Sequence, residues 1–208
     1  MKKRWIALAL IASGAALACI AYACWDIPLA HFCRELGRPV LDVTEWITMA
    51  GESRWYFMVL APALLIFWRI VKSKKWTIRM FFLLASISAS GMINILLKWI
   101  AGRNRPVNLF DHGLFGFDLL ETGYALNSFP SGHTVTVFSL AAALSLLFPR
   151  FGAWAFLPAA IIAASRVMLT SHYLSDVIAG AVVGVVCTLG VKYAFDRSNA
   201  TLGPGGRQ

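Results

Sequence analysis

Charge is scarce in this chain, and negative charge is scarcest. Of its 208 residues 14% are charged, with 10 Asp and Glu against 19 Lys and Arg, whereas 59% are hydrophobic and the mean hydropathy is +0.68. Soluble globular domains carry about 25% charged residues, so the composition excludes an ordinary soluble domain of this size. The chain is therefore expected to lie in a lipid bilayer.

Cysteine is also rare, and its spacing excludes two classes of small domain. The four cysteines form no CxxC or Cys/His pattern, so neither a disulfide framework nor a zinc site is expected. They are interpreted as small apolar packing residues, with a bridge between Cys24 and Cys33 as the alternative. The sequence also has no cluster of carboxylates that could ligate a divalent cation. Neither a metal nor another cofactor is therefore expected.

What the chain has in abundance is long apolar runs. Six of them approach the roughly 20 residues that a helix needs to cross a bilayer. They cover residues 5–25, 55–71, 76–99, 133–148, 151–169 and 174–195. The second run is the weakest, because Pro62 lies in its middle. The predicted fold class is all-α: a polytopic membrane protein with six transmembrane helices in one bundle and two longer extracytoplasmic loops.

No internal repeat or linker divides this bundle. One membrane domain is expected over residues 1–195, followed by a flexible cytoplasmic tail over residues 196–208. The basic start and the apolar residues after it are similar to a signal peptide, which leaves cleavage as an alternative. The run is long for a signal, so it is interpreted as a retained first span.

Basic residues are distributed unevenly between alternate loops. Twelve of the 19 Lys and Arg residues fall on one side of the predicted bundle, and nine of the 10 acidic residues fall on the other. By the positive-inside rule both termini are cytoplasmic, and the loops at 26–54 and 101–130 lie outside. This topology accounts for most of the net charge of +9. Membrane lipids, rather than nucleic acids, are therefore the expected partners.

Three polar clusters interrupt the apolar pattern, at residues 98–106, 130–133 and 165–176. In the predicted topology the third run ends at the first cluster and the fourth run begins at the second. The third cluster joins the fifth run to the sixth. All three clusters therefore meet at the outer membrane face, which predicts one composite site.

The residue types in these clusters favour phosphate chemistry. Three of them are cations: Lys98, Arg105 and Arg166. Guanidinium groups offer planar forks to phosphate oxygens, and an ammonium offers a point charge. Ser131, Gly132 and His133 stand at the start of a predicted helix, whose first N–H groups and positive dipole end attract an anion. The clusters therefore predict a phosphate-binding pocket.

Two histidines can divide the reaction between them. His172 and Asp176 are four residues apart, so on a helix the carboxylate can hold the imidazole in one tautomer. This predicts His172 as the nucleophile that attacks phosphorus and His133 as the general acid that protonates the departing oxygen. The cations would stabilise the charge that grows on the equatorial oxygens.

Several neighbouring residues also have a structural interpretation. Arg103 is interpreted as a snorkelling anchor at the end of a span. Arg166 and Asp176 either belong to the site or form a structural ion pair inside the bundle. Gly180 and Gly184 are expected at a close helix contact.

The two outer loops carry apolar residues of their own. The segment after Asp26 places them at helical spacing, and it either lies along the membrane surface or caps the bundle. In the second loop, the apolar residues around Phe115 and Phe117 are predicted to dip into the membrane interface and shape a lipid entrance.

Together, the three clusters resemble the signature of the type 2 phosphatidic acid phosphatase superfamily. The matching segments are Lys98-(six residues)-Arg105-Pro106, Pro130-Ser131-Gly132-His133 and Ser165-Arg166-(five residues)-His172-(three residues)-Asp176. The resemblance implies an integral membrane lipid phosphatase that needs no metal and works through a phosphohistidine on His172. It also assigns to the substrate phosphate the residues Lys98, Arg105, Ser131, Gly132, His133 and Arg166.

The resemblance leaves the lipid open. Similar proteins act on phosphatidic acid, phosphatidylglycerol phosphate, undecaprenyl diphosphate or the phosphates of lipid A. Two alternative functions also remain: transfer of the phosphoryl group to another lipid, and non-enzymatic lipid transport that uses the cations alone. The expected location is a bacterial inner membrane, with the active site at its extracytoplasmic face.

Overall fold

The computed structural model describes residues 2–121 and 123–198 of the chain. Within these ranges it is helical, without strands and with one isolated bridge between Arg103 and Phe117. The α-helices are α1 (Lys2–Cys24), α2 (Asp26–Arg34), α3 (Arg38–Met49), α4 (Ser53–Leu65), α5 (Lys74–Ala101), α6 (Pro106–His112), α7 (Gly132–Leu147), α8 (Phe156–Met168) and α9 (Leu174–Arg197). Shorter helical turns are η1 (Ile66–Ile70), η2 (Tyr124–Leu126) and η3 (Gly152–Ala155). The predicted all-α class is confirmed.

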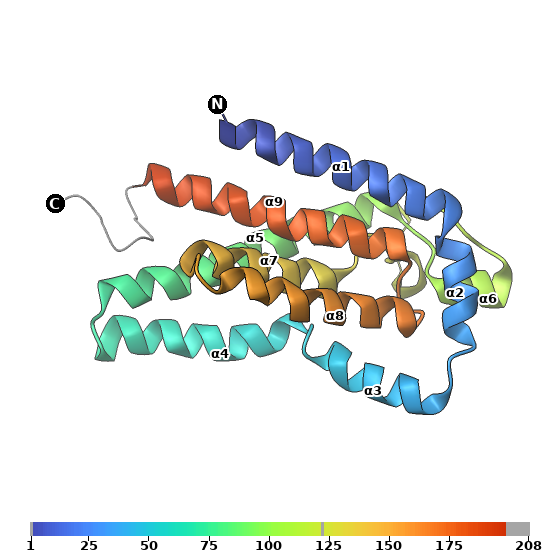
Figure 1. The fold of residues 1–208 in the computed structure, drawn as a ribbon, viewed down its shortest axis with the longest axis horizontal. Helices are drawn as coiled ribbons and strands as arrows, with labels where there is room; N and C mark the ends of the chain where they lie inside the picture. Colours follow the sequence, from blue (N-terminus) through green and yellow to red (C-terminus); the bar gives the residue numbers. More distant parts are fainter. Residues whose placement is uncertain (1, 122, 199–208) are drawn as a thin grey trace.

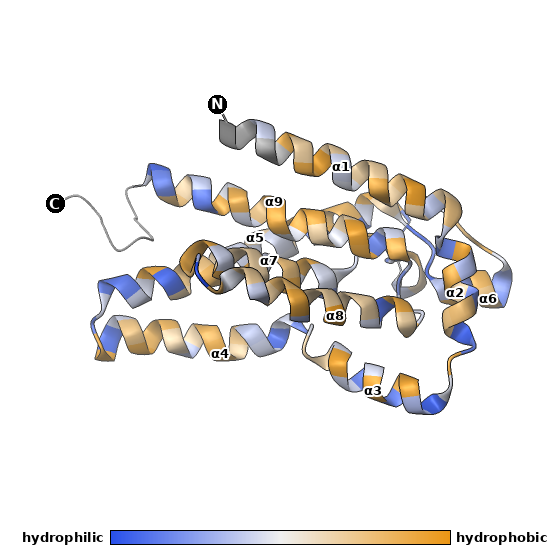
Figure 2. Cartoon of the chain, viewed as in Figure 1, coloured by the Kyte–Doolittle hydropathy of each residue, from blue (hydrophilic) through white to orange (hydrophobic). Residues whose placement is uncertain are grey.

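Apolar residues cover most of the length of the long helices, as a bilayer requires (Figure 2). Two helices, α5 and α9, are long and apolar enough to cross a membrane, and α1 with α2 forms a pair bent by 62° that could be a third span. α7 and the stretch Gly152–Met168 are apolar but shorter. All six predicted runs therefore fall on helical segments, while the number of spans stays a prediction.

The helices form one elongated bundle whose two ends differ (Figure 1). α1 begins and α9 ends at the same end, on the left of the view. α5 and α8 end, and α7 and α9 begin, at the opposite end, where α2, α3 and α6 also lie. Inside the bundle, α7 packs against α5, α8 and α9, and α1 packs against α9. This arrangement brings the three polar clusters to one end of the bundle.

The weakest predicted run is helical throughout, with an irregular turn after its proline. Pro62 lies inside α4, where it contributes no backbone N–H to the helix. The next turn, η1, is a π-helix, in which the N–H of Val71 donates to the carbonyl oxygen of Ile66 at 3.0 Å. π-turns of this kind absorb irregularities within a helix.

Glycines let α9 approach α7 closely at the site. A Cβ on Gly180 would lie 2.9 Å from the carbonyl oxygen of Ser131, and a Cβ on Gly184 would lie 2.5 Å from that of Val135. Further along α9, the hydroxyl groups of Ser139 and Thr188 lie 2.9 Å apart and join the same two helices. The predicted close helix contact is therefore present, and it connects the helices that carry His133 and Asp176.

The first outer loop caps the bundle. Ala30 and Cys33 of α2 are buried, and Cys33 packs against Ala163 and Val167 of α8. Of the two interpretations of this segment, the structure therefore favours capping over a position along the membrane surface. Cys24 and Cys33 are both free thiols, so the alternative disulfide is not formed.

The second outer loop is folded and begins at a glycine. Gly102 ends α5 with φ of +52°, and a Cβ there would lie 1.8 Å from the carbonyl oxygen of Asp118. The loop then folds back, so that the N–H of Asn104 donates to Gly116 O at 3.0 Å and that of Arg105 to Ala125 O at 2.8 Å.

At the other end of the chain, α9 continues two residues past the predicted domain end, to Arg197. Of the predicted flexible tail, residues 199–208 lie outside the described residues.

Candidate active site

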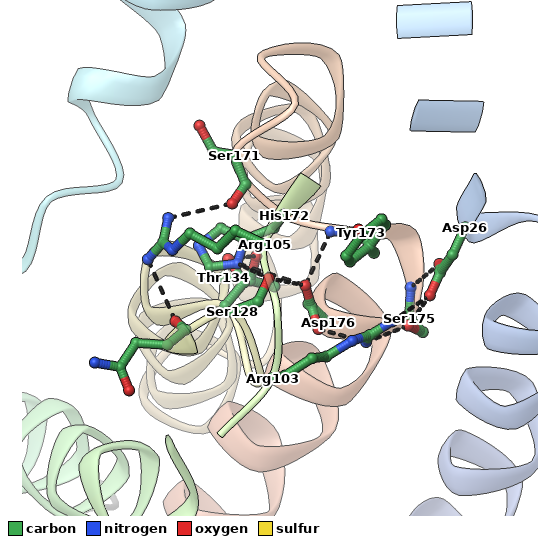
Figure 3. A network of polar contacts seen from close by, with 12 residues as sticks. Asp26, Arg103, Arg105, Ser128, Thr134, Ser171, His172, Tyr173, Ser175 and Asp176 are labelled. Carbon is green, nitrogen blue, oxygen red and sulfur yellow. Dashed lines mark hydrogen bonds and ion pairs between the residues drawn. The ribbon is translucent and has the colours of Figure 1, made fainter. Parts of the chain in front are cut away.

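His172 lies in the short link between α8 and α9, where the three polar clusters meet. Its side chain is 3% exposed, and its N–H donates to the carbonyl oxygen of Arg166 at 3.2 Å. This hydrogen bond holds the link against the last turn of α8. Figure 3 shows His172 beside Arg105 and Ser128. The link therefore holds the imidazole at the centre of the site.

Asp176 lies against the Nδ1 side of the His172 ring. Its Oδ2 atom is 3.6 Å from Nδ1, and Ser128 Oγ is 3.5 Å from the same nitrogen. Oδ2 also accepts hydrogen bonds from Ser128 Oγ at 2.6 Å and from the N–H of Tyr173 at 2.9 Å, the latter as part of a capping box at the start of α9. The structure therefore brings the two residues together on the Nδ1 side, which leaves Nε2 as the nitrogen for reaction.

Arg103 binds the other carboxylate oxygen of Asp176. Its Nη1 donates to Asp176 Oδ1 at 2.5 Å and to Ser175 Oγ at 2.6 Å, and its Nη2 donates to Asp26 Oδ2 at 2.6 Å (Figure 3). The side chains of Arg103 and both aspartates are fully buried. The interpretation of Arg103 as a membrane anchor is wrong, because the loop folds back over the bundle end and turns this side chain inward.

Four aromatic rings enclose the Arg103 guanidinium. Its Cζ atom lies 4.8 to 5.8 Å from the ring centres of Tyr22, Phe115, Phe117 and Tyr173. Phe115 also stacks on Tyr22, with 4.9 Å between the ring centres. These rings pack around a buried cation, whose charge their faces attract. Phe117 also stays 42% exposed, and the position of this loop at the membrane interface stays a prediction.

Lys98 and Arg105 lie together on the cationic side of the site. Lys98 Nζ and Arg105 Nη2 both donate to the carbonyl oxygen of Asn127, the second at 3.3 Å, and Arg105 Nη1 donates to Ser171 O at 3.2 Å. Neither cation forms an ion pair with a carboxylate within residues 2–121 and 123–198. Backbone carbonyls therefore orient both side chains without cancelling their charge.

Arg166 adds a third cation from the last turn of α8. Its Nη1 donates to Thr48 Oγ1 at 2.8 Å, so the alternative structural ion pair with Asp176 is not formed. The Nε atoms of Arg105 and Arg166 are buried and have no hydrogen-bond partner in the described part of the chain. An unpaired buried donor is costly, so both groups favour an anionic acceptor between them.

The start of α7 faces the same cations. Ser131 is the N-cap residue, and its N–H donates to the carbonyl oxygen of Asp176 at 3.1 Å while its hydroxyl accepts a hydrogen bond from Thr134 at 3.1 Å. Ser131 therefore ties α7 to α9. The next residues, Gly132 and His133, form the first turn, whose N–H groups have no partner within the helix. Their dipole end adds to the positive potential of the site.

The link between α3 and α4 contacts the general-acid candidate directly. A Cβ on Gly51 would lie 2.8 Å from Cδ2 of His133 and 2.8 Å from Cγ2 of Ile162. The bare backbone at Gly51 therefore supports one side of the His133 ring. The preceding helix, α3, also supplies Thr48 to Arg166.

A cleft of about 680 Å³ opens from His133 between α4, α5 and α7. Its walls include Phe57 of α4 and Ile87, Met92 and Ile95 of α5. An apolar cleft that ends at a cationic pocket suits a molecule with a hydrocarbon part and an anionic head.

Burial lowers the pKa of His172 from its ordinary 6.5 to about 4. Asp176 opposes this shift, whereas the positive charges of Arg105 and Lys98 add to it. Because Arg103 shares the charge of Asp176, the carboxylate cannot reverse the effect of burial. The imidazole is therefore neutral at pH 7, which is the state that a nitrogen nucleophile needs.

Among the described residues, no group of three or more His, Cys, Asp or Glu side chains has the geometry of a metal site. The acidic groups nearest to His172 are bound to Arg103 instead. Lys98, Arg105 and Arg166 instead lie close enough to act on the two histidines, and their cationic N–H donors suit an anion.

Sequence analysis missed five residues that build this site: Asp26, Thr48, Gly51, Arg103 and Ser128. Two of them left a signal. Asp26 is a lone carboxylate directly after a long apolar run, and Arg103 stands two residues before Arg105. Ionisable residues next to spans are functional candidates in membrane proteins. Thr48, Gly51 and Ser128 left none, because their roles come from contacts between distant segments.

Known proteins share this signature and this fold. A family model described as the PAP2 superfamily matches residues 79–200. A lipid A 1-phosphatase from Rhizobium johnstonii is 35% identical over 172 residues, which cover 76% of this chain and 69% of that protein. A lipid A 1-phosphatase from Rhizobium etli is 35% identical over 163 residues, which cover 72% of this chain and 69% of that protein.

Two solved structures resemble the bundle. The crystal structure of Aquifex aeolicus LpxE superposes with a TM-score of 0.60 and 24% identity, over 81% of this chain and 94% of that one. A transmembrane PAP2 type phosphatidylglycerolphosphate phosphatase from Bacillus subtilis superposes with a TM-score of 0.68 and 23% identity, over 92% of this chain and 96% of that one. At these identities the likeness concerns the fold.

Proposed function

This chain belongs to the PAP2 superfamily and is a membrane lipid phosphatase, and we propose that it removes the 1-phosphate of lipid A at the outer face of a bacterial inner membrane. Two relatives that are 35% identical carry the name lipid A 1-phosphatase, which supports this choice over the other lipid phosphates. The roles of the site residues described below are part of the same proposal.

The observation that carries the proposal is a group of half-buried cations beside a neutral histidine. Lys98, Arg105 and Arg166 have no carboxylate partner among the described residues, and two of their Nε atoms lack any acceptor. A phosphate monoester dianion supplies both the charge and the oxygens that these groups lack. A neutral headgroup would leave these cations unpaired.

In the proposed first step, Nε2 of His172 attacks phosphorus and the bond from phosphorus to the lipid oxygen breaks. Asp176 stabilises the positive charge that develops on the imidazole. The bound phosphate dianion offsets the nearby cations and favours the protonated form of His133, which then donates its proton to the lipid oxygen, so that the dephosphorylated lipid leaves as an alcohol. The cations stabilise the three equatorial oxygens more strongly in the transition state than in the substrate.

In the second step, water attacks the phosphohistidine and releases inorganic phosphate. His133, now neutral, accepts a proton from this water, and the bond between phosphorus and Nε2 breaks. His172 and His133 thereby return to their initial states. No metal is required in either step, because the cations hold the charge that a metal would otherwise hold.

The apolar cleft between α4, α5 and α7 would hold the lipid part of the substrate. It meets the phosphate pocket at His133, where the leaving oxygen must lie for protonation. Because its walls belong to helices that face the bilayer, a lipid would reach the pocket from the side of the bundle.

The proposal is tested by assaying purified protein against lipid A, phosphatidic acid, phosphatidylglycerol phosphate and undecaprenyl diphosphate. Released phosphate is measured, and mass spectrometry of the lipid product locates the lost group. We expect the highest kcat/KM on lipid A, with loss of the 1-phosphate. A clear preference for another lipid would reject the substrate, and phosphate recovered on an acceptor lipid instead of in solution would indicate transfer.

His172→Ala serves as the matched blank. We expect it to release no phosphate while still binding the lipid, since the cations remain. Full turnover by this variant would reject the phosphohistidine mechanism. Sidedness is tested separately with a reporter inserted within residues 101–130, which we expect to report an extracytoplasmic position.

A further inference from the structure

Two buried charged residues, Asp26 and Arg103, have no part in the reaction described above. Asp26 is 1% exposed and Arg103 is 1% exposed, and together with Asp176 they form a group of two carboxylates and one guanidinium. Burying charge is costly unless each group is paired and hydrogen-bonded. A buried group of this kind next to the nucleophile candidate therefore needs an explanation.

Arg103 is held at both Nη atoms, whereas its buried Nε has no hydrogen-bond partner among the described residues. Nη1 binds Asp176 and Ser175, Nη2 binds Asp26, and four aromatic rings surround the plane of the guanidinium. An arginine with both Nη groups engaged and its faces covered has little freedom to rotate. It therefore holds Asp176 Oδ1 in one position, which sets the direction of Oδ2 toward His172.

Asp26 connects the bend between α1 and α2 to Arg103 and to the first turn of α9. It begins α2, at the 62° bend between α1 and α2. Its Oδ1 accepts the N–H of Ser175 at 3.0 Å, and its Oδ2 accepts the hydroxyl of Ser175 at 2.5 Å and Nη2 of Arg103 at 2.6 Å. The first turn of α9, which carries Asp176, is thus bound to the bend by two hydrogen bonds from Ser175, and Arg103 adds a third to the same carboxylate. Asp26 also lies outside residues 79–200, which the family model matches.

We propose that Arg103 and Asp26 are positioning residues that act through Asp176 to hold His172 in line for attack. Without Arg103, the carboxylate of Asp176 loses its main counter-charge and its fixed direction. Without Asp26, Arg103 loses one of its two anchors and the first turn of α9 loses its link to the bend. In this account the pair of helices α1 and α2 is needed for the chemical step as well as for membrane insertion.

This inference rests on the proposed function of His172, and it makes a specific kinetic prediction. Arg103 does not line the phosphate pocket, so its loss should affect the attack and leave ground-state phosphate binding intact. Residues that orient a reacting group through one intermediate contact typically change activity by about 10- to 100-fold. We expect Arg103→Met to lower kcat by about 100-fold and Asp26→Asn by about 10-fold, with KM nearly unchanged.

Two inhibitors separate positioning from phosphate binding. Inorganic phosphate needs only the cations, whereas orthovanadate can become five-coordinate and then needs an in-line fifth ligand from His172. We expect the inhibition constant of phosphate to stay within about threefold in both variants, while that of vanadate rises in proportion to the loss of kcat, as for a transition-state analogue. A purely structural role would weaken both inhibitors together.

The controls are matched in chemistry and lie outside the hydrogen-bonded group of Asp26, Arg103 and Asp176. Arg34→Met and Asp42→Asn change exposed residues of α2 and α3, and they should behave like the unaltered protein. Arg103→Lys keeps the charge but can reach only one of the two carboxylates well, so it should restore part of kcat and of vanadate binding. If Arg103→Met does not fold in detergent, Asp26→Asn and Arg103→Lys carry the test with the same measurements.

Two results would overturn the inference. One is a normal kcat in Arg103→Met and Asp26→Asn; the other is a rise in KM and in the phosphate inhibition constant as large as the fall in kcat. Either result with an inactive His172→Ala removes only this inference. An active His172→Ala removes the proposed function itself, so the two failures can be told apart.

Discussion

Two groups of charged residues lie on either side of His172, one buried and one half-buried, and they differ in charge balance. On the Asp176 side, Arg103 is paired with two carboxylates, and the remaining oxygens accept hydrogen bonds from Ser128, Ser175 and Tyr173. On the pocket side, three cations have no carboxylate partner in the described ranges. The group in which Arg103 is paired with carboxylates fixes the position of Asp176. The group of unpaired cations favours the binding of an anion.

The difference shows how to separate a structural charge from a functional one. A buried ion pair says little about function when each partner is satisfied. Among residues 2–121 and 123–198, the buried Nε atoms of Arg103, Arg105 and Arg166 all lack acceptors, but only the charge of Arg103 is matched by carboxylates. For Arg105 and Arg166 an anion would supply both the acceptor and the counter-charge. The pocket side is therefore where a ligand contributes most, and substitutions on the two sides should have different kinetic signatures.

The largest effect is expected on the unbalanced side. Arg105→Met removes a charge that the transition state needs, so we expect kcat to fall by about 100- to 1,000-fold, together with weaker phosphate inhibition. Steady-state kinetics with lipid phosphate and competition by inorganic phosphate measure both effects. Arg150→Met, an exposed arginine at the other end of the bundle, is the control. A loss of less than threefold would mean that Arg105 does not bind the transferred group.

A smaller effect is expected where the backbone supports His133. In Gly51→Ala the new Cβ would lie 2.8 Å from the His133 ring, so the ring must move. We expect kcat to fall by about 10-fold or more, since small displacements of catalytic groups are costly, while phosphate inhibition stays normal. Gly190→Ala, where a Cβ meets nothing within 4 Å, is the matched control. Equal activity of the two variants would show that the contact between Gly51 and His133 does not matter for the reaction.

The pKa of His172 depends on both groups, because burial and the cations lower it while Asp176 raises it. Its pKa is lowered to about 4, so the folded protein keeps the ring neutral between pH 6.5 and 4 while the unfolded chain takes up a proton. This residue therefore stabilises the fold fully above pH 6.5, and that contribution is lost as the pH falls toward 4. NMR of ¹⁵N-labelled histidine, assigned with His172→Gln, measures the titration. A midpoint at or above 6.5 would show that Asp176 outweighs burial and the cations.

The smallest effect is expected from chelators. Because cations and N–H donors line the pocket, EDTA should leave the rate of phosphate release unchanged. The measurement is an assay before and after dialysis against the chelator, with Mg²⁺ added back. Strong inhibition that a divalent ion reverses would mean that a metal completes the unbalanced side.

The helices and the three clusters could be predicted because their signals are local. The apolar runs at 76–99 and 174–195 mark α5 and α9 to within two residues. Spacing also pointed to His172 and Asp176 as a pair, but the expected shared helix face is absent. His172 lies in the link before α9 and meets Asp176 of the first turn of that helix. The partner of Asp176 could not be predicted in the same way, because Arg103 reaches it across 73 positions of sequence.

Hydropathy and the spacing of polar residues were enough to predict a helical membrane protein whose three polar clusters, with the proposed phosphate-binding residues, gather at one end of the bundle. Hydropathy and charge are read from short stretches of sequence, so these predictions do not depend on knowing which distant residues are in contact. The pairing of Arg103 with carboxylates, the absence of such partners for Arg105 and Arg166 over the residues that the structure describes, and the contact of Gly51 with His133 became visible in the folded structure. Those outcomes depend on how two outer loops fold back over the bundle end, which is set by packing between distant segments.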